Sequence, residues 1–205
     1  MLKVRELECV RGDHRLFKGL NFELHPGELL HLRGSNGAGK TSLLRIVCGL
    51  MDPAEGEILW NGQNIRSNRE DFNRGLLYLG HQNGIKGELS ALENLQIFNS
   101  LLGIKISEKK ILDALSHIGL AGREDLPTKV LSQGQKRRVA LARLLISDAV
   151  LWILDEPFTA LDVHAVEMLK SLITQHIHKS GMVMLTTHQV VEIDATNIKE
   201  VNLSA

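Results

Sequence analysis

Gly34-Ser-Asn-Gly-Ala-Gly39-Lys40-Thr41 is the stretch of this 205-residue chain that decides its fold. It fits the pattern G-x-x-x-x-G-K-[ST] and follows the apolar residues 29–32, so it has the strand, loop and helix context that the pattern requires. Its three glycines allow consecutive backbone N–H groups to curl around an anion, and the following helix adds its positive N-terminal end. The stretch predicts a phosphate-binding loop; a glycine-rich turn before an ordinary helix is the competing interpretation.

Two side chains of this loop have distinct expected roles. Lys40 reaches the β- and γ-phosphates of a nucleotide, and the Thr41 hydroxyl binds Mg²⁺. ATP and Mg²⁺ are therefore the expected ligands. The nucleotide-binding residues predicted in and beside the loop are Gly34, Ser35, Asn36, Gly37, Ala38, Gly39, Lys40, Thr41 and Ser42.

Composition narrows the class of protein. Lys plus Arg equals Asp plus Glu at 24 each, so no overall basic field points to a nucleic-acid partner. Cys9 and Cys48 show no C-x-x-C spacing, which indicates buried thiols in a reducing compartment. Residues 1–8 alternate like a strand and lack the apolar core of a signal peptide, and no apolar run approaches the ~18 residues that span a bilayer. A cytosolic protein is expected, with any membrane role arising through a partner.

Strand signals dominate residues 1–33 and return after the loop. Asn61-Gly62 lies between two short strand-like segments and predicts an antiparallel hairpin with a type I′ turn. Helices are expected at residues 40–48 and from about 163, and strands at residues 76–79, 150–154, 182–185 and 198–203.

Helical patterns fill the middle of the chain. Ser90 and Glu93 form a capping-box pattern, and further helices are expected to begin at Ser107 and Ser132. Residues of about 87–148 should therefore form a helical insert between two strands of the main sheet. The expected fold class is α/β: a P-loop NTPase core with an antiparallel β subdomain and an inserted α-helical subdomain.

Two carboxylates end the apolar strand at residues 150–154. Asp155 and Glu156 would lie beside the phosphate loop, because carboxyl ends of parallel strands share one edge of a sheet. There Asp155 can hold Mg²⁺ through water, and Glu156 can polarise an attacking water. The second carboxylate suggests hydrolysis by water; a solvated Asp-Glu pair before Pro157 is the competing interpretation.

The segment Leu131-Ser-Gln-Gly-Gln135 resembles the LSGGQ signature of the ATP-binding cassette (ABC) family. Locally, Ser132 is a helix N-cap and Gln135 its capping-box partner. The resemblance implies that Ser132, Gln133, Gly134 and Gln135 act in trans on the nucleotide of a second copy, so that two chains enclose two ATP molecules head to tail. Gln133 departs from the commoner Gly, which should leave contacts from Ser132 and Gly134 intact.

Other family elements match in order along the chain. Gln82 corresponds to the Q-loop, a third predicted Mg²⁺ contact; Asp162 corresponds to the D-loop and His188 to the switch histidine. His188 would act with Glu156 in catalysis. The family commonly places an aromatic residue where this chain has Arg11, whose guanidinium can stack on adenine or remain solvated.

Two groups of basic residues receive simpler interpretations. Lys136-Arg137-Arg138 alternates with an apolar helix face and is expected to be a solvated or phosphate-facing cluster. Six histidines are expected to be ordinary surface residues: His14, His25, His117, His164, His176 and His178.

The ABC resemblance covers essentially the whole chain and implies a single ATP-binding domain at residues 1–205. Within the family, residues 80–86, 91–95, 137–144, 151–160 and 186–189 resemble the ATP-binding subunits of heme exporters in cytochrome c biogenesis. This implies integral membrane subunits similar to CcmB and CcmC, a place on the cytoplasmic side of the bacterial inner membrane, and ATP-driven release of a heme-loaded chaperone. No C-x-x-C-H motif occurs, so no direct heme binding is expected.

Three alternatives remain open at this point. The chain can be the ATPase of an ABC transporter for another substrate, since membrane subunits choose the substrate. A soluble ABC protein acting on ribosomes or DNA usually has two cassettes or a long coiled coil, and this chain has neither. A nucleotide-dependent interaction module without turnover is disfavoured by Glu156 and His188.

Overall fold

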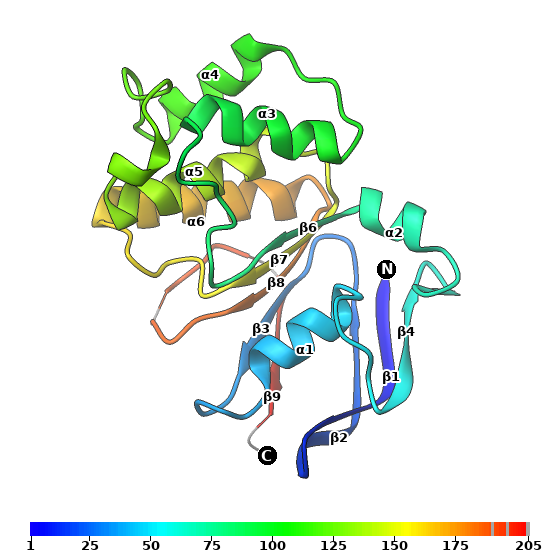
Figure 1. Cartoon of the computed structure of the whole chain (residues 1–205). Helices are drawn as coiled ribbons and strands as arrows, with labels where there is room; N and C mark the ends of the chain where they lie inside the picture. The colour runs from blue at the N-terminus through cyan, green and yellow to red at the C-terminus, as the bar shows by residue number, and fades with distance from the viewer. Residues whose placement is uncertain (190, 196, 204–205) are drawn as a thin grey trace. The chain divides into compact units, whose positions relative to one another are not determined.

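The computed structural model describes residues 1–189, 191–195 and 197–203, and Figure 1 traces its elements. Two compact units divide the chain, and each is described by itself. The first unit comprises residues 1–78, 149–157 and 173–205, and the second comprises residues 79–148 and 158–172. Among the described residues, no helix has both the length and the apolar character needed to cross a membrane.

The first unit contains a parallel sheet whose three central strands end at the predicted site. Its strand order is β6-β7-β8-β3-β9, and β8 pairs in parallel with both β7 and β3. The strands are β3 (Leu29–Arg33), β6 (Leu76–Leu79), β7 (Leu151–Asp155), β8 (Met182–Thr186) and β9 (Ile198–Asn202). Every residue of β7 and of β8 is buried, as expected for central parallel strands. The phosphate loop follows β3, and Asp155 and Thr186 end the other two central strands.

An antiparallel sheet with the order β2-β1-β4-β5 completes the first unit. Its strands are β1 (Leu2–Arg11), β2 (His14–Leu24), β4 (Glu55–Trp60) and β5 (Gln63–Asn64). Asn61 and Gly62 both have positive φ, 50° and 84°, which is the geometry of the type I′ turn that the sequence predicts.

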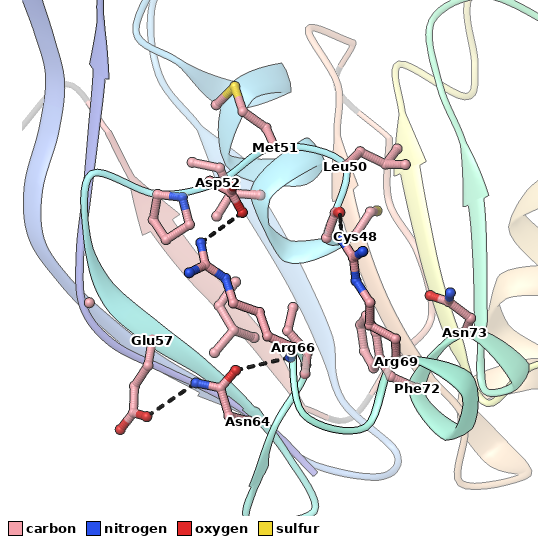
Figure 2. Close-up of a pocket in the computed structure, with 16 residues that line it drawn as sticks. Cys48, Leu50, Met51, Asp52, Glu57, Asn64, Arg66, Arg69, Phe72 and Asn73 are labelled. Atoms are coloured by element: carbon pink, nitrogen blue, oxygen red, sulfur yellow. Dashed lines mark hydrogen bonds and ion pairs between the residues drawn. The ribbon is translucent and has the colours of Figure 1, made fainter.

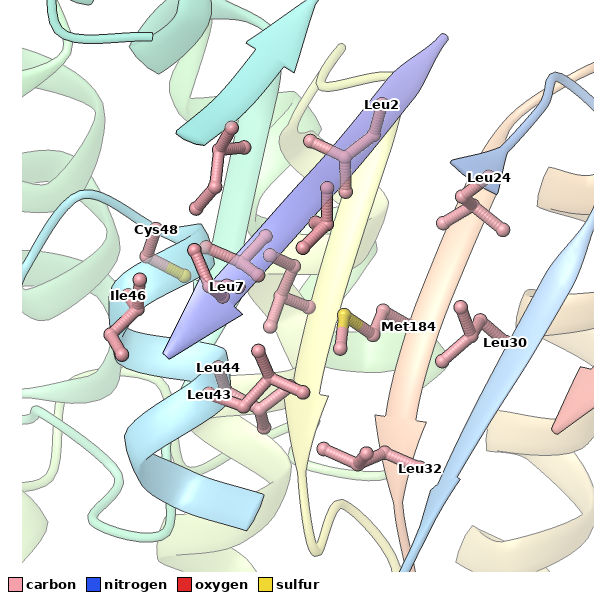
Figure 3. Close-up of a cluster of buried hydrophobic side chains, with 14 of the residues drawn as sticks. Leu2, Leu7, Leu24, Leu30, Leu32, Leu43, Leu44, Ile46, Cys48 and Met184 are labelled. Carbon is pink, nitrogen blue, oxygen red and sulfur yellow. The ribbon is translucent and has the colours of Figure 1, made fainter. Parts of the chain in front are cut away.

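One apolar core joins the strands of the first unit to α1 (Lys40–Val47), as Figure 3 shows. Leu43 and Leu44 of α1 have no exposed surface, and they belong to the same cluster as Leu30 and Leu32 of β3. Because α1 begins directly after the phosphate loop, this packing fixes the helix N-terminus against the sheet. The unit also includes α2 (Arg69–Arg74), a short helix that the sequence analysis does not predict.

The second unit contains three helices with their own apolar core: α3 (Ala91–Leu101), α4 (Glu108–His117) and α5 (Gln133–Ile146). Ser90 and Glu93 form the predicted capping box, and Ser132 and Gln135 form another at the start of α5. A 3₁₀ turn, η1 (Thr128–Val130), precedes α5, and α6 (Val163–His178) runs through residues of both units. The predicted α/β class, with an antiparallel sheet and inserted helices, is confirmed.

Candidate nucleotide-binding site

The phosphate loop between β3 and α1 has the backbone geometry that an anion site requires. Gly34, Gly37 and Gly39 have φ values of 149°, 86° and 99°, in the region that favours glycine. A Cβ atom at Gly39 would lie 3.1 Å from Cβ of Leu16, so side-chain space is also limited there. The loop glycines thus allow the turn that directs backbone N–H groups towards a phosphate.

Lys40, the first residue of α1, folds back over this loop. Its Nζ donates hydrogen bonds to the carbonyl oxygens of Gly34, at 2.7 Å, and Ser35, at 3.1 Å. The ammonium group is therefore held at the mouth of the loop. A phosphate entering the loop would meet this charge at short range.

Asp155, at the end of β7, is hydrogen-bonded to residues of α1 and β8. It is 2% exposed; its Oδ2 accepts a hydrogen bond from Thr41 Oγ1 at 2.9 Å, and its Oδ1 accepts one from Thr186 Oγ1 at 2.8 Å. The parallel pairing of β7 with β8 places Asp155 opposite Thr186. A buried carboxylate with two hydroxyl donors has its orientation fixed.

Glu156 follows with an unusual backbone conformation. Its φ is 50°, uncommon for a non-glycine residue, and its N–H donates to Thr186 Oγ1 at 2.9 Å. The backbone N–H of His188 donates to Glu156 Oε2 at 3.3 Å, and His188 Nε2 lies 3.4 Å from Oε1. The structure therefore brings together the predicted catalytic pair, Glu156 and His188.

Thr186 is the residue of this group that the sequence analysis does not assign. Its hydroxyl donates to Asp155 and accepts from the Glu156 N–H, so it links the two carboxylate residues. In the sequence, Thr186 ends an apolar strand two residues before His188 and begins the segment 186–189 of the family resemblance, but neither signal assigns it a role.

A cavity of about 320 Å³ opens beside the loop, bounded in part by Gly34, Lys40, His188 and His31. His31 lies on β3, and its Nε2 is buried without a hydrogen-bond partner among the described residues. Burial, together with the charge of Arg33, lowers the pKa of the His31 ring. The ring is therefore neutral at neutral pH, and its unpaired nitrogen can accept or donate one hydrogen bond.

The donors at this edge of the sheet suit Mg²⁺. Thr41 and Asp155 place a hydroxyl and a carboxylate oxygen 2.9 Å apart, and Mg²⁺ prefers oxygen ligands, with water and phosphate completing its shell. The described residues include no cluster of three or more His, Cys, Asp or Glu side chains suited to a metal ion. Gln82, the third predicted Mg²⁺ contact, is an exposed residue of the second unit.

The predicted signature lies at the start of α5 in the second unit. Ser132 Oγ accepts from the Gln135 N–H at 3.2 Å, and the Gln135 side chain accepts from the Ser132 N–H at 2.9 Å. Ser132 and Gln133 are exposed. A Cβ at Gly134 would lie 2.9 Å from the carbonyl oxygen of Ala160, so only glycine fits against that segment.

Asp162 lies in the same unit, directly before α6. Its Oδ1 accepts from the Ala165 N–H at 2.9 Å, and Arg138 of α5 forms an ion pair with its other oxygen. The Ala165 N–H bond and the charge of Arg138 lower the pKa of Asp162. The predicted signature and D-loop residues are thus brought together within the second unit.

Three further predictions, about Arg11, the basic cluster at residues 136–138 and His176, have different outcomes. Arg11 is exposed at the tip of the β1–β2 hairpin, and its contact with adenine stays a prediction. Arg137 is 4% exposed, so the prediction of a solvated or phosphate-facing cluster is wrong for this residue; Lys136 and Arg138 are partly exposed, and Arg138 pairs with Asp162. His176 stacks on Trp152 with ring centroids 3.8 Å apart, so it is no ordinary surface residue.

A second cavity, of about 290 Å³, lies in the first unit away from the predicted site residues. Figure 2 shows Arg66 paired with Asp52, at 2.7 Å, and Arg69 beside the loop that follows α1. Phe72 of α2 contributes to its apolar lining. Its lining gives no reason to include it in the nucleotide site.

Comparison with known proteins shows the family to which the chain belongs. A family model described as "ABC transporter" matches residues 17–159. The chain is 54% identical over 204 residues to a Nitrosomonas europaea protein named "Cytochrome c biogenesis ATP-binding export protein CcmA", covering 100% of this chain and 96% of that protein. A Dechloromonas aromatica protein of the same name is 56% identical over 203 residues, covering 99% and 100%. The solved structure of an ATP binding subunit of an ABC transporter is 27% identical, with a TM-score of 0.83, covering 92% of this chain and 79% of that one. The predicted ABC ATPase fold is confirmed.

Proposed function

Because the chain belongs to the ABC transporter family, we propose that it is the ATP-hydrolysing subunit of a heme-handling transporter in cytochrome c biogenesis. The observation that carries the heme assignment is the identity of 54–56% with relatives whose printed name is cytochrome c biogenesis ATP-binding export protein. The catalytic assignment rests on the chain of hydrogen bonds from Thr41 through Asp155 and Thr186 to Glu156.

Each site residue of the first unit has a separate proposed role in ATP hydrolysis. The loop N–H groups and Lys40 hold the phosphates of ATP. Thr41 and Asp155 would hold Mg²⁺, which neutralises charge on the β- and γ-phosphates when bound. Glu156 orients the attacking water and accepts its proton, while His188, beside the Glu156 carboxylate, donates to the γ-phosphate.

Glu156 suits this task because hydrogen bonds fix both its backbone and one oxygen of its carboxylate. The Thr186 hydroxyl fixes its backbone N–H, and the His188 backbone N–H reaches one carboxylate oxygen. Its positive φ is a strained conformation that surrounding contacts maintain, as is common where a side chain must be aimed at a substrate.

We further propose that two copies of the chain form an ATP-bound dimer in which Ser132 acts in trans. The exposed N-terminus of α5, with Ser132 and the side-chain-free Gly134, suits a γ-phosphate of another copy. Integral membrane subunits, similar to CcmB and CcmC, would hold the dimer at the cytoplasmic face of the inner membrane.

Mixing two inactive variants tests the dimer. Lys40→Ala removes the phosphate contact, and Ser132→Arg blocks the signature. In a mixed dimer one composite site carries both changes and the other carries neither, so the mixture should regain partial ATPase activity that neither variant shows alone. Failure to regain activity, with mixed dimers verified by differently tagged chains, would argue against action in trans.

The heme assignment is tested in a strain whose only copy is ATPase-dead, with either Lys40→Ala or Glu156→Gln. Heme should still become attached to the periplasmic chaperone but should not be released, so holo-chaperone accumulates and mature c-type cytochromes disappear. Heme-stained gels of membrane fractions measure both. Normal c-type cytochromes in this strain would remove the heme assignment and leave the ATPase assignment untouched.

A further inference from the structure

Two arginines of α5 hold the segment of residues 80–84, at whose centre Gln82 lies. Arg137 Nη1 donates to the carbonyl oxygen of Gly80 at 3.0 Å and to Asn83 Oδ1 at 3.2 Å. Arg143 Nη2 donates to the carbonyl oxygen of Gly84 at 2.6 Å. Along the chain, this segment follows β6 and precedes α3, as Figure 1 traces.

Burial makes the Arg137 contacts energetically significant. The residue is 4% exposed, and a buried guanidinium that loses its acceptors is strongly destabilising. Its planar fork of donors can satisfy a backbone carbonyl and a side-chain amide at fixed angles, which an ammonium group cannot do as well. The acceptors belong to the residues two before and one after Gln82, so the segment is fixed on both sides of it.

Arg143 secures the far end of the segment. Burial lowers the pKa of its guanidinium, and its Cζ lies 4.8 Å from the centroid of the Phe98 ring. Gly84 has a φ of 59°, and a Cβ there would lie 3.5 Å from Arg143 Nη1. The left-handed turn at Gly84 therefore presents its carbonyl to Arg143 at close range.

The Gln82 side chain, by contrast, is exposed. Its neighbours are fixed while its own amide remains available to a ligand. The helix that fixes them also carries Ser132 as its N-cap, so α5 bears the signature at its first turn and anchors the Gln82 segment further along.

We propose that Arg137 is a positioning residue for Gln82: it fixes the segment of residues 80–84 to α5, so that the exposed Gln82 amide is held in one orientation for its predicted Mg²⁺ contact. This inference rests on the proposed ATPase function and on the predicted role of Gln82 as a Mg²⁺ contact. It also links the Gln82 segment mechanically to the signature, since both are fixed to one helix.

The test uses the full chain with Glu156→Gln, which slows turnover, and measures ATP affinity by calorimetry with Mg²⁺ and with EDTA. Gln82→Ala and Arg137→Lys are each expected to weaken binding about two- to tenfold with Mg²⁺, the effect of one hydrogen bond, and to leave binding in EDTA unchanged. The double variant Gln82→Ala/Arg137→Lys should bind ATP with Mg²⁺ no more weakly than Gln82→Ala alone. Amide hydrogen exchange in residues 80–84 of the nucleotide-free chain should accelerate in Arg137→Lys.

Arg123→Lys is the matched control, because Arg123 is an exposed arginine of the same unit, outside α5. Arg123→Lys should change neither the amide hydrogen exchange of residues 80–84 nor the affinity for ATP. Asn83→Ala provides a second variant that leaves the buried charge in place, and it should reproduce the Mg²⁺-dependent loss if Arg137→Lys fails to fold.

Three results would overturn the inference. If Gln82→Ala weakens Mg²⁺-dependent binding but Arg137→Lys and Asn83→Ala do not, Gln82 keeps its role and Arg137 does not position it. If the effects of Gln82→Ala and Arg137→Lys add fully, Arg137 acts independently of Gln82. If Gln82→Ala has no effect, the proposed Mg²⁺ role of Gln82 fails, and the inference fails with it.

Discussion

Glu156→Gln is expected to bind ATP with unchanged affinity and to hydrolyse it on the order of 10²-fold or more slowly, the loss typical of removing a general base. The amide has the size of the carboxylate and can still accept the hydrogen bond from the His188 N–H, so the loop at His188 should stay in place. The amide cannot accept a proton from water. Phosphate release under saturating ATP measures the turnover rate, and calorimetry measures the affinity.

Glu167→Gln is a suitable control for this variant. Glu167 is an exposed residue of α6 that pairs with Lys170, so the same chemical change there should leave turnover unchanged. Wild-type turnover in Glu156→Gln would mean that another group takes the proton. Reduced ATP affinity in that variant would instead point to a structural role for the carboxylate.

Local sequence patterns account for the parts of the structure that were predictable. The phosphate loop, the Asn61-Gly62 turn and the capping boxes at Ser90 and Ser132 each depend on residues within a few positions of one another. Turn conformation and capping are decided by such short-range contacts, so composition and spacing suffice to predict them. The strand before Asp155 is likewise predictable from a short run of apolar residues.

Contacts between distant segments were not predictable in the same way. Thr186 reaches Asp155 because β7 and β8 pair in one register, which a single strand pattern does not specify. Arg137 follows a basic neighbour on a helix, which favours a solvated interpretation, yet its partners Gly80 and Asn83 lie more than fifty residues away in the chain. His176 likewise finds its stacking partner, Trp152, only through the folded sheet.

Lys40→Ala is expected to abolish tight ATP binding. The ammonium group at the mouth of the loop, now bonded to the carbonyls of Gly34 and Ser35, is the charge expected to face the β- and γ-phosphates. Losing one charge-assisted contact costs about 1.5–3 kcal/mol, which corresponds to roughly ten- to a hundredfold weaker binding. Calorimetric titration with ATP and Mg²⁺ measures the change directly.

The backbone of the loop should survive this substitution, because the glycines at 34, 37 and 39 set its shape and α1 is held by apolar packing. An unchanged melting temperature would separate loss of binding from loss of folding. Lys105→Ala, at an exposed position of the second unit, is the matched control and should bind ATP normally.

The affinity for ADP, which lacks the γ-phosphate, should fall less than the affinity for ATP in Lys40→Ala, since part of the Lys40 contact is to that group. Near-normal ATP affinity in a folded Lys40→Ala chain would exclude the phosphate-loop assignment. If residues 34–41 bind the nucleotide, the Lys40 ammonium group must contact its phosphates.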